Sequence, residues 1–120
     1  MLLAGGGDRA TTGSCGAFAG ALMALGACFS PRADEPPEQE MAKFNKTRLT
    51  LHGFRDWFIA ECGGVTCADV QRHEFGRIYN FMDANDQKEF AMSPETRRKC
   101  FAITIKAAFK VSEMLLNKGI

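Results

Sequence analysis

A long helical segment in the last quarter of the chain, with a clear beginning, constrains the fold more than any other feature. Ser93, Pro94 and Glu95 supply an N-cap residue, a proline at the first helical position and an acid in the first turn. They predict a helix from Pro94 to about Asn117. Apolar residues at helical spacing predict one buried face on it, made of Cys100, Ile103, Ala107, Val111, Met114 and Leu115.

A second long helix is predicted from Glu38 to Cys62. Two prolines at 36–37 can open this helix, and the pair Gly63-Gly64 ends it. Its apolar residues also recur at helical spacing and predict a second buried face, made of Met41, Phe44, Leu51, Phe54 and Phe58.

Three shorter helices complete the expected set: Cys15 to about Ala27 with Ser14 as N-cap, Cys67 to about Arg72 with Thr66 as N-cap, and Ala84 to Ala91 with Asp83 as N-cap. Residues 1–13 read as a Gly-rich loop and residues 30–37 as a linker. Small residues at spacing four in 15–27, such as Gly16 and Gly20, predict the close approach of another backbone. No stretch alternates like a strand. We therefore expect one all-α domain over 1–120, a small bundle of about three main helices plus short ones.

Charge and hydropathy exclude two classes of partner. The formal net charge is +1 and no basic stripe is present, so we expect no nucleic-acid binding. The apolar run Cys15–Ala27 is too short to span a bilayer, so we expect no membrane insertion and a cytoplasmic location. Alternatively, residues 25–28 resemble a lipoprotein cleavage box, which would make Cys28 a lipidated N-terminus.

Five cysteines, an odd number without a clear secretory signal, indicate reduced thiols, metal ligation or redox chemistry. Cys15 and Cys67 each follow a predicted N-cap residue. A helix N-terminus favours an anion and lowers the pKa of a thiol, and the thiolate is both nucleophile and metal ligand. Cys62 forms a C-x4-C pair with Cys67, as a further metal ligand or a disulfide partner. From pattern alone, Cys100 reads as core filler unless the other cysteines converge on it.

Three segments resemble a known family. The first is residues 13–26, a Gly-rich approach to a helix that begins Cys15-Gly16-Ala17; the others are residues 58–67, ending in Cys67, and residues 98–100, ending in Cys100. Together they resemble the C_GCAxxG_C_C family of redox-active proteins. The resemblance implies redox activity through Cys15, Cys67 and Cys100. The family pattern begins with a further cysteine before the Gly-rich loop, to which nothing here corresponds, so a fourth ligand would come from Cys62, Cys28 or a partner chain.

The expected function is a redox protein whose thiolates bind an iron–sulfur cluster or another metal for electron transfer. The expected ligands are Cys15, Cys67, Cys100 and Cys62, with Ser14, Gly16 and Thr66 lining the cofactor at the two helix starts. One alternative is a metal-free thiol–disulfide redox protein. The other is a helical assembly domain with inert cysteines. The expected partners are a redox partner protein and a second copy of the chain, because the small-residue helix leaves a face that a second chain could cover.

Overall fold

The computed structural model describes residues 6, 11, 13–30, 33–34 and 36–117. Within them the chain forms five helices and no strand, so the all-α prediction is confirmed. The predicted loop 1–13 lies mostly outside the described residues. The helices are α1 (Gly16–Phe29), α2 (Pro37–Cys62), α3 (Cys67–Phe75), α4 (Ala84–Met92) and α5 (Pro94–Asn117).

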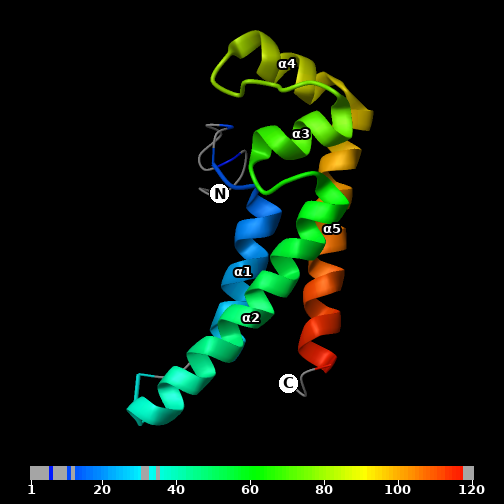
Figure 1. Ribbon diagram of the computed structural model, residues 1–120. Coiled ribbons are helices and arrows are strands. Elements are labelled where there is room, and N and C mark those ends of the chain that lie inside the picture. Colours follow the sequence, from blue (N-terminus) through cyan, green and yellow to red (C-terminus); the bar gives the residue numbers. More distant parts are fainter. Residues whose placement is uncertain (1–5, 7–10, 12, 31–32, 35, 118–120) are drawn as a thin grey trace.

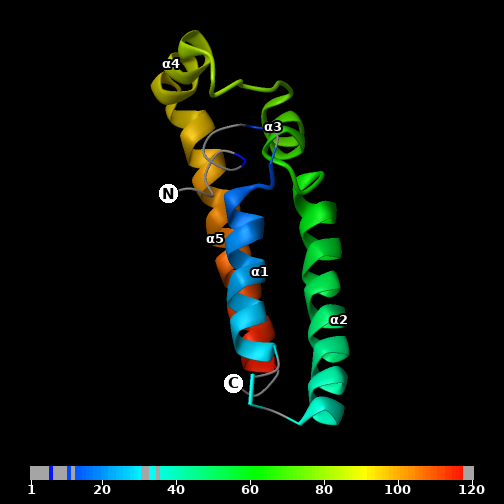
Figure 2. The same cartoon turned by 90° about the vertical axis from the view of Figure 1, so that its left-hand side faces the viewer.

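The molecule is elongated, with principal extents of 53 × 24 × 19 Å. The long helices α1, α2 and α5 run side by side, and the short helices α3 and α4 gather at one end (Figures 1 and 2). Because α1 begins at that same end, the first turn of α1 and the first turn of α3 become neighbours. This places Cys15 and Cys67 close together although they are far apart in sequence.

The core is built around three phenylalanine rings. The ring centroid of Phe18 on α1 lies 6.1 Å from that of Phe54 and 5.2 Å from that of Phe58, both on α2. Each pair contributes about 0.5–1.5 kcal/mol beyond area burial. Leu25 on α1 is fully buried in the same core. The predicted α5 face supplies the rest through Ile103, Ala107 and Val111, which are all buried.

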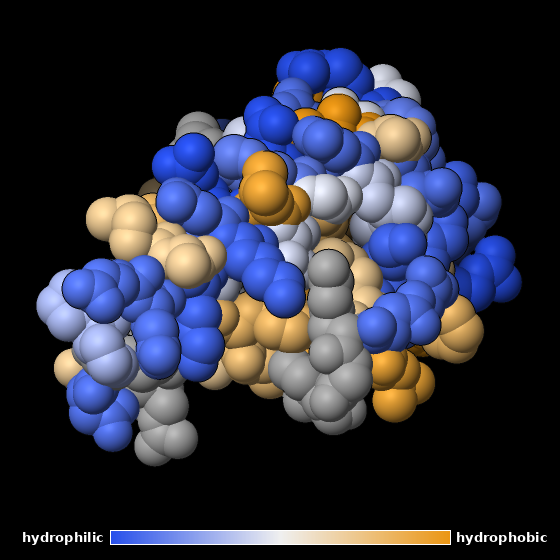
Figure 3. Space-filling view, turned by 60° about the horizontal axis from the view of Figure 1, so that its bottom comes forward, coloured by the Kyte–Doolittle hydropathy of each residue, from blue (hydrophilic) through white to orange (hydrophobic). Residues whose placement is uncertain are grey.

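Two members of the predicted α2 face do not reach the core. Met41 and Phe44 are 62% and 51% exposed, because the N-terminal part of α2 extends past the neighbouring helices (Figure 1). Apolar residues also stay at the surface among charged ones when the bundle is viewed from that end (Figure 3). Helical periodicity predicts which face of α2 is apolar, but the length of the neighbouring helices decides how much of that face is covered.

The predicted N-caps are confirmed at three of four helices. The hydroxyl of Ser93 accepts from the Thr96 amide at 3.3 Å at the start of α5. The hydroxyl of Thr66 accepts from the Asp69 amide at 3.0 Å, and the carboxylate of Asp83 accepts from the Asp86 amide at 3.1 Å. The prediction that Ser14 caps the first helix is wrong. Cys15 is the N-cap residue of α1, because Ser14 pairs with Thr66 in an isolated antiparallel bridge.

The predicted close approach of a backbone to the small residues of α1 is also wrong at Gly20. A Cβ added at Gly20 would meet no atom within 4 Å.

No helix among the described residues combines the length and the hydrophobicity of a membrane-spanning segment. Cys28 is exposed in the last turn of α1. A chain beginning at Cys28 would lack most of α1 and with it the buried side chains of Phe18, Ala21 and Leu25.

Replacement by alanine should change the free energy of unfolding in opposite directions at Gly53 of α2 and at Gly63, its C-cap residue. Gly63 ends the helix at φ +86°, and an added Cβ would lie 2.7 Å from Cβ of His73. Gly63→Ala should therefore lower the free energy of unfolding by about 1–3 kcal/mol. The matched control is Gly53→Ala, in the interior of the same helix, where an added Cβ meets nothing within 4 Å. It should raise the free energy of unfolding by about 0.5–1 kcal/mol, measured by urea denaturation. Equal effects of the two changes would contradict this account.

Candidate functional site

A short backbone bridge joins the beginnings of α1 and α3. The Cys15 amide donates to the carbonyl oxygen of Val65 at 2.7 Å, and the Cys67 amide donates to that of Gly13 at 2.9 Å. These two bonds flank the Ser14–Thr66 pair. Since successive residues of an extended segment alternate between faces, Cys15 and Cys67 lie on the face opposite to Ser14 and Thr66. The bridge therefore presents two cysteines on one side.

Cys15 occupies the N-cap position of α1, where acceptor side chains are usual. Its thiol makes no capping hydrogen bond. Among the described residues, the amides of Ala17 and Phe18, at the second and third positions of the helix, have no acceptor. The thiol of Cys15 is half-buried. A thiolate at this position would be placed to accept from these first-turn amides.

The N-terminus of α3 is arranged differently. Its first three amides are already bonded: Cys67 to the carbonyl of Gly13, Ala68 to the carbonyl of Thr11, and Asp69 to the hydroxyl of Thr66. The helix start therefore offers little to an anion. Burial raises the pKa of Cys67 above its ordinary value, a hydrogen bond from Gln71 lowers it, and repulsion from Cys15 raises it further. The prediction of a lowered pKa at Cys67 is wrong, because the thiol is buried. Other groups already use the amides that could have stabilised its thiolate.

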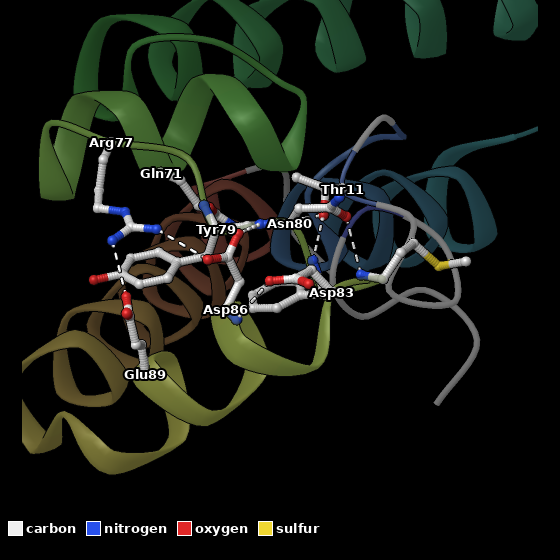
Figure 4. Close-up of polar contacts among 10 residues, drawn as sticks. Thr11, Gln71, Arg77, Tyr79, Asn80, Asp83, Asp86 and Glu89 are labelled. Atoms are coloured by element: carbon white, nitrogen blue, oxygen red, sulfur yellow. Dashed lines mark hydrogen bonds and ion pairs between the residues drawn. The ribbon is translucent and has the colours of Figure 1, made fainter.

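The amide orientation of Gln71 is determined by its two partners. Its Oε1 accepts from the backbone N–H of Tyr79 at 2.5 Å, and a backbone N–H can only donate. Its Nε2 must therefore point toward Cys67, to whose Sγ it donates at 3.3 Å. Gln71 is 3% exposed and lies between α3 and the segment that follows (Figure 4). The only side-chain donor to a cysteine sulfur among the described residues thus acts on Cys67.

Part of the Gly-rich segment packs directly on Cys67. A Cβ added at Gly6, which has φ +81°, would lie 2.9 Å from Cβ of Cys67. Thr11 is buried at φ +67°, a region that costs a non-glycine residue about 1 kcal/mol or more. Its hydroxyl donates to the carbonyl of Tyr79 at 3.4 Å and accepts from the amide of Phe81 at 3.3 Å (Figure 4). These contacts cover the Cys67 side of the site.

The other two candidate cysteines, Cys62 and Cys100, are close enough to Cys15 for its charge to affect their pKa values. Cys62 ends α2 and is 1% exposed; burial raises its pKa to about 11, with smaller contributions from the charges of Glu74 and Cys15. Cys100 is an exposed residue, yet burial of its thiol raises its pKa, and repulsion from Cys15 and Cys67 adds to this. Both thiols are therefore protonated at neutral pH.

Cys15 is the common neighbour in this group. Repulsion from its sulfur acts on Cys62, Cys67 and Cys100, whereas Cys28 contributes to none of these pKa values. Cys62, Cys67 and Cys100 therefore lie within electrostatic range of Cys15, whereas no such effect of Cys28 is present among the described residues. Within the described ranges, however, no three Cys, His, Asp or Glu side chains are placed so that they could hold one metal ion. The four sulfurs as arranged here do not form a ready ligand set for the predicted cluster.

One of three comparisons with known proteins found a match. The family model described as "Putative redox-active protein (C_GCAxxG_C_C)" matches residues 1–114. The chain belongs to this family. Neither the curated proteins nor the solved structures contain a match. Membership of the C_GCAxxG_C_C family assigns the chain to the redox-active proteins and leaves the chemistry of its cysteines to be derived from the site.

Two residues of the site, Gln71 and Thr11, are not predicted from the sequence. Gln71 sits four residues after Cys67, so it lies over the same face of α3. This spacing of four is the only sign of Gln71 in the sequence, and one glutamine on a helix is not enough to predict a contact with a cysteine. Thr11 gave no signal, because its role depends on a positive φ and on contacts with residues 68, 79 and 81.

Replacing Gln71 should change the titration of Cys67. Gln71→Met keeps the length of the side chain but removes the donor that stabilises the Cys67 thiolate. The pKa of Cys67 should rise further, so alkylation of Cys67 near neutral pH should slow by about threefold to tenfold, as expected for the loss of one hydrogen bond. The measurement is the pH dependence of Cys67 alkylation, read by peptide mass spectrometry.

Gln87→Met is the matched control for this change. Gln87 also donates from Nε2 to the backbone of the segment after α3, at the carbonyl of Phe81, but does not contact a cysteine. Its replacement should leave the alkylation profile of Cys67 unchanged. The same shift in both variants would mean that loosening of the segment, and not loss of the donor, controls Cys67.

Proposed function

We propose that this protein is a dithiol–disulfide redox protein in which Cys15 is the attacking thiol and Cys67 the thiol that completes the disulfide. The bridge that holds both cysteines on one face of two paired backbone segments carries this proposal. Dithiol chemistry needs only two sulfurs. The hydrogen-bonded backbone of the bridge fixes the positions of Cys15 and Cys67. A metal centre held by one chain would require at least one further ligand.

The two cysteines differ in the way that the reaction needs. Cys15 is half-buried and so accessible to a substrate, and the amides of the first turn of α1 are available to its thiolate. Cys67 is 9% exposed and lies under Gly6. An external disulfide can therefore meet Cys15 first, while Cys67 is reached from inside the protein.

The spacing across the bridge suits reversible bond formation. Cys67 is the diagonal neighbour of Cys15, and such pairs have Cα atoms about 7–8 Å apart. A disulfide requires about 4.4–6.8 Å between Cα atoms. A disulfide between them would therefore require the two segments to approach each other, and a strained bond of this kind is readily reduced again.

The reaction transfers two electrons. The Cys15 thiolate attacks one sulfur of a disulfide R–S–S–R′; a mixed disulfide forms between Cys15 and R, and R′ leaves as a thiolate that takes up a proton. The sulfur of Cys67 then attacks Sγ of Cys15, and the proton of the Cys67 thiol passes to R, which is released as a thiol. The substrate disulfide is reduced to two thiols and the protein dithiol is oxidised. A dithiol reductant, such as a redox partner protein, reverses both steps.

The test is to identify which cysteines become linked. Reduced protein is treated with one equivalent of glutathione disulfide, trapped at low pH and digested for mass spectrometry. The expected product is a disulfide between Cys15 and Cys67. A Cys62–Cys67 disulfide that forms equally fast in Cys15→Ser would overturn the proposal.

The iron–sulfur alternative has its own outcome. Protein purified without oxygen is analysed for iron and acid-labile sulfide. Iron and sulfide in matching amounts, lost in Cys67→Ser, would replace the dithiol proposal by a cluster bound in a rearranged site.

A further inference from the structure

We propose that two copies of the chain associate through the outer face of α5, antiparallel to each other about a two-fold axis near Ile105. The second copy was expected from the sequence on the small-residue helix. The structure instead points to α5, and this inference does not depend on the dithiol chemistry.

The outer face of α5 is apolar and uncovered. The face that carries Ile103 and Ala107 packs in the core. Ile105 lies between them in sequence and hence on the opposite side of the helix. There it belongs to a second stripe at spacings of four and seven, made of Phe101, Ile105, Phe109 and Leu116, which are 66%, 68%, 72% and 74% exposed. A helix with two apolar faces needs a second partner.

The area of this stripe matches the requirement of a dimer. Each of the four side chains leaves roughly 100–150 Å² open to solvent, to judge from the usual size of such residues. One stripe thus amounts to about 400–600 Å², as large as the largest apolar patch of typical monomers. Two copies would together bury about 800–1,200 Å², near the roughly 1,000 Å² that a specific interface needs.

The order of residues along α5 favours the antiparallel arrangement. A shallow groove covers its N-terminal half, lined by Pro94, Arg97, Arg98, Phe101, Ala102 and Ile105. In an antiparallel pair centred on Ile105, Phe109 of one copy faces Phe101 of the other, and Leu116 reaches Pro94. The large side chains of the C-terminal half then meet the groove of the N-terminal half, and both contacts occur twice, as an isologous interface requires.

Charge supports the same direction. Arg97, Arg98 and Lys99 form a basic run near the beginning of α5, and Glu113 lies near its end. A parallel pair would place the two basic runs side by side, where like charges repel. The antiparallel pair separates them and brings Glu113, which pairs with Lys110 of its own chain at 3.3 Å, to the level of the partner's basic run.

The first test is the mass of the protein in solution, from light scattering after gel filtration at micromolar concentrations. The expected value is twice the 13.2 kDa of one chain. Ile105→Asp should reduce it to that of one chain. Leu49→Asp, at an equally exposed position on α2, is the matched control and should stay dimeric. A monomeric wild type, or a dimer that survives Ile105→Asp, would overturn the proposal.

A charge exchange tests the direction of pairing and does not rely on one variant. Phe101→Glu alone and Phe109→Lys alone should each weaken the dimer by at least about thirtyfold, since each places an unpaired charge in the interface. The double variant should recover most of the affinity, because each Glu then faces a Lys of the other copy. In a parallel pair the double variant would be weaker than either single one, and that result would overturn the antiparallel arrangement. Circular dichroism confirms that each variant is folded.

Discussion

Cys15→Ser is expected to lower the rate of thiol–disulfide exchange by about a thousandfold or more, because a serine hydroxyl does not ionise at neutral pH and cannot attack a disulfide. Serine is also a good N-cap residue, so it should accept from the amides of Ala17 or Phe18 and preserve α1. Loss of activity should therefore come without loss of stability. The measurement is the reduction of glutathione disulfide by the dithiol-regenerated protein, followed at fixed pH.

Cys28→Ser is the matched control for this prediction. Cys28 lies on the same helix, is exposed, and is remote from the group around Cys15. Its replacement should leave the exchange rate within about twofold of wild type, since no proposed step involves it. If Cys15→Ser keeps wild-type activity, or if Cys28→Ser loses it, the assignment of Cys15 as the attacking thiol fails.

Phe58→Ala is expected to lower the free energy of unfolding by about 3–5 kcal/mol. Phe58 is fully buried, and its ring contacts Phe18 and Phe54 with centroid distances of 5.2 and 6.0 Å. Alanine would remove the ring and leave a cavity between α1 and α2. Such a loss is a large part of the stability of a small domain, so α1 and the bridge that it carries would loosen as well. Urea denaturation measures the loss, and the exchange rate should fall with it.

Phe44→Ala provides the comparison on the same helix. Phe44 belongs to the same predicted apolar face but is 51% exposed, because the neighbouring helices do not extend that far. Its replacement should change stability by no more than about 0.5 kcal/mol. Similar losses in the two variants would show that the N-terminal part of α2 is covered in solution.

The helices could be predicted from the sequence because their signals are local. Pro94 opens α5, Gly63 closes α2 at a left-handed φ, and Thr66 caps α3 through its own hydroxyl. Each of these signals acts within a few residues through steric restriction or a single hydrogen bond, so no tertiary contact is needed to interpret it. The core face of α5 was predictable for the same reason.

The site was predictable only in part. Cysteines at the beginnings of α1 and α3 are visible in the sequence, and so is the family pattern that joins them to Cys100. Their chemical states were not predictable, because ionisation depends on which groups occupy the helix amides and on burial. At Cys67 burial raises the pKa, which is the reverse of the expected direction, and the carbonyls of Thr11 and Gly13 take amides that could otherwise favour a thiolate.

By itself, then, the sequence determined the fold class, the helix boundaries to within a few residues, and the family to which the chain belongs. The tertiary structure decided that Cys15 is accessible and Cys67 is buried, and that Gln71 donates a hydrogen bond to Cys67. It also decided which apolar helix faces remain exposed to solvent. The physical reason is the distance along the sequence over which each interaction acts. Caps, turns and periodicity act over one or two helical turns, whereas burial and hydrogen-bond competition depend on residues distant in sequence, such as Thr11, whose carbonyl accepts from Ala68 of α3.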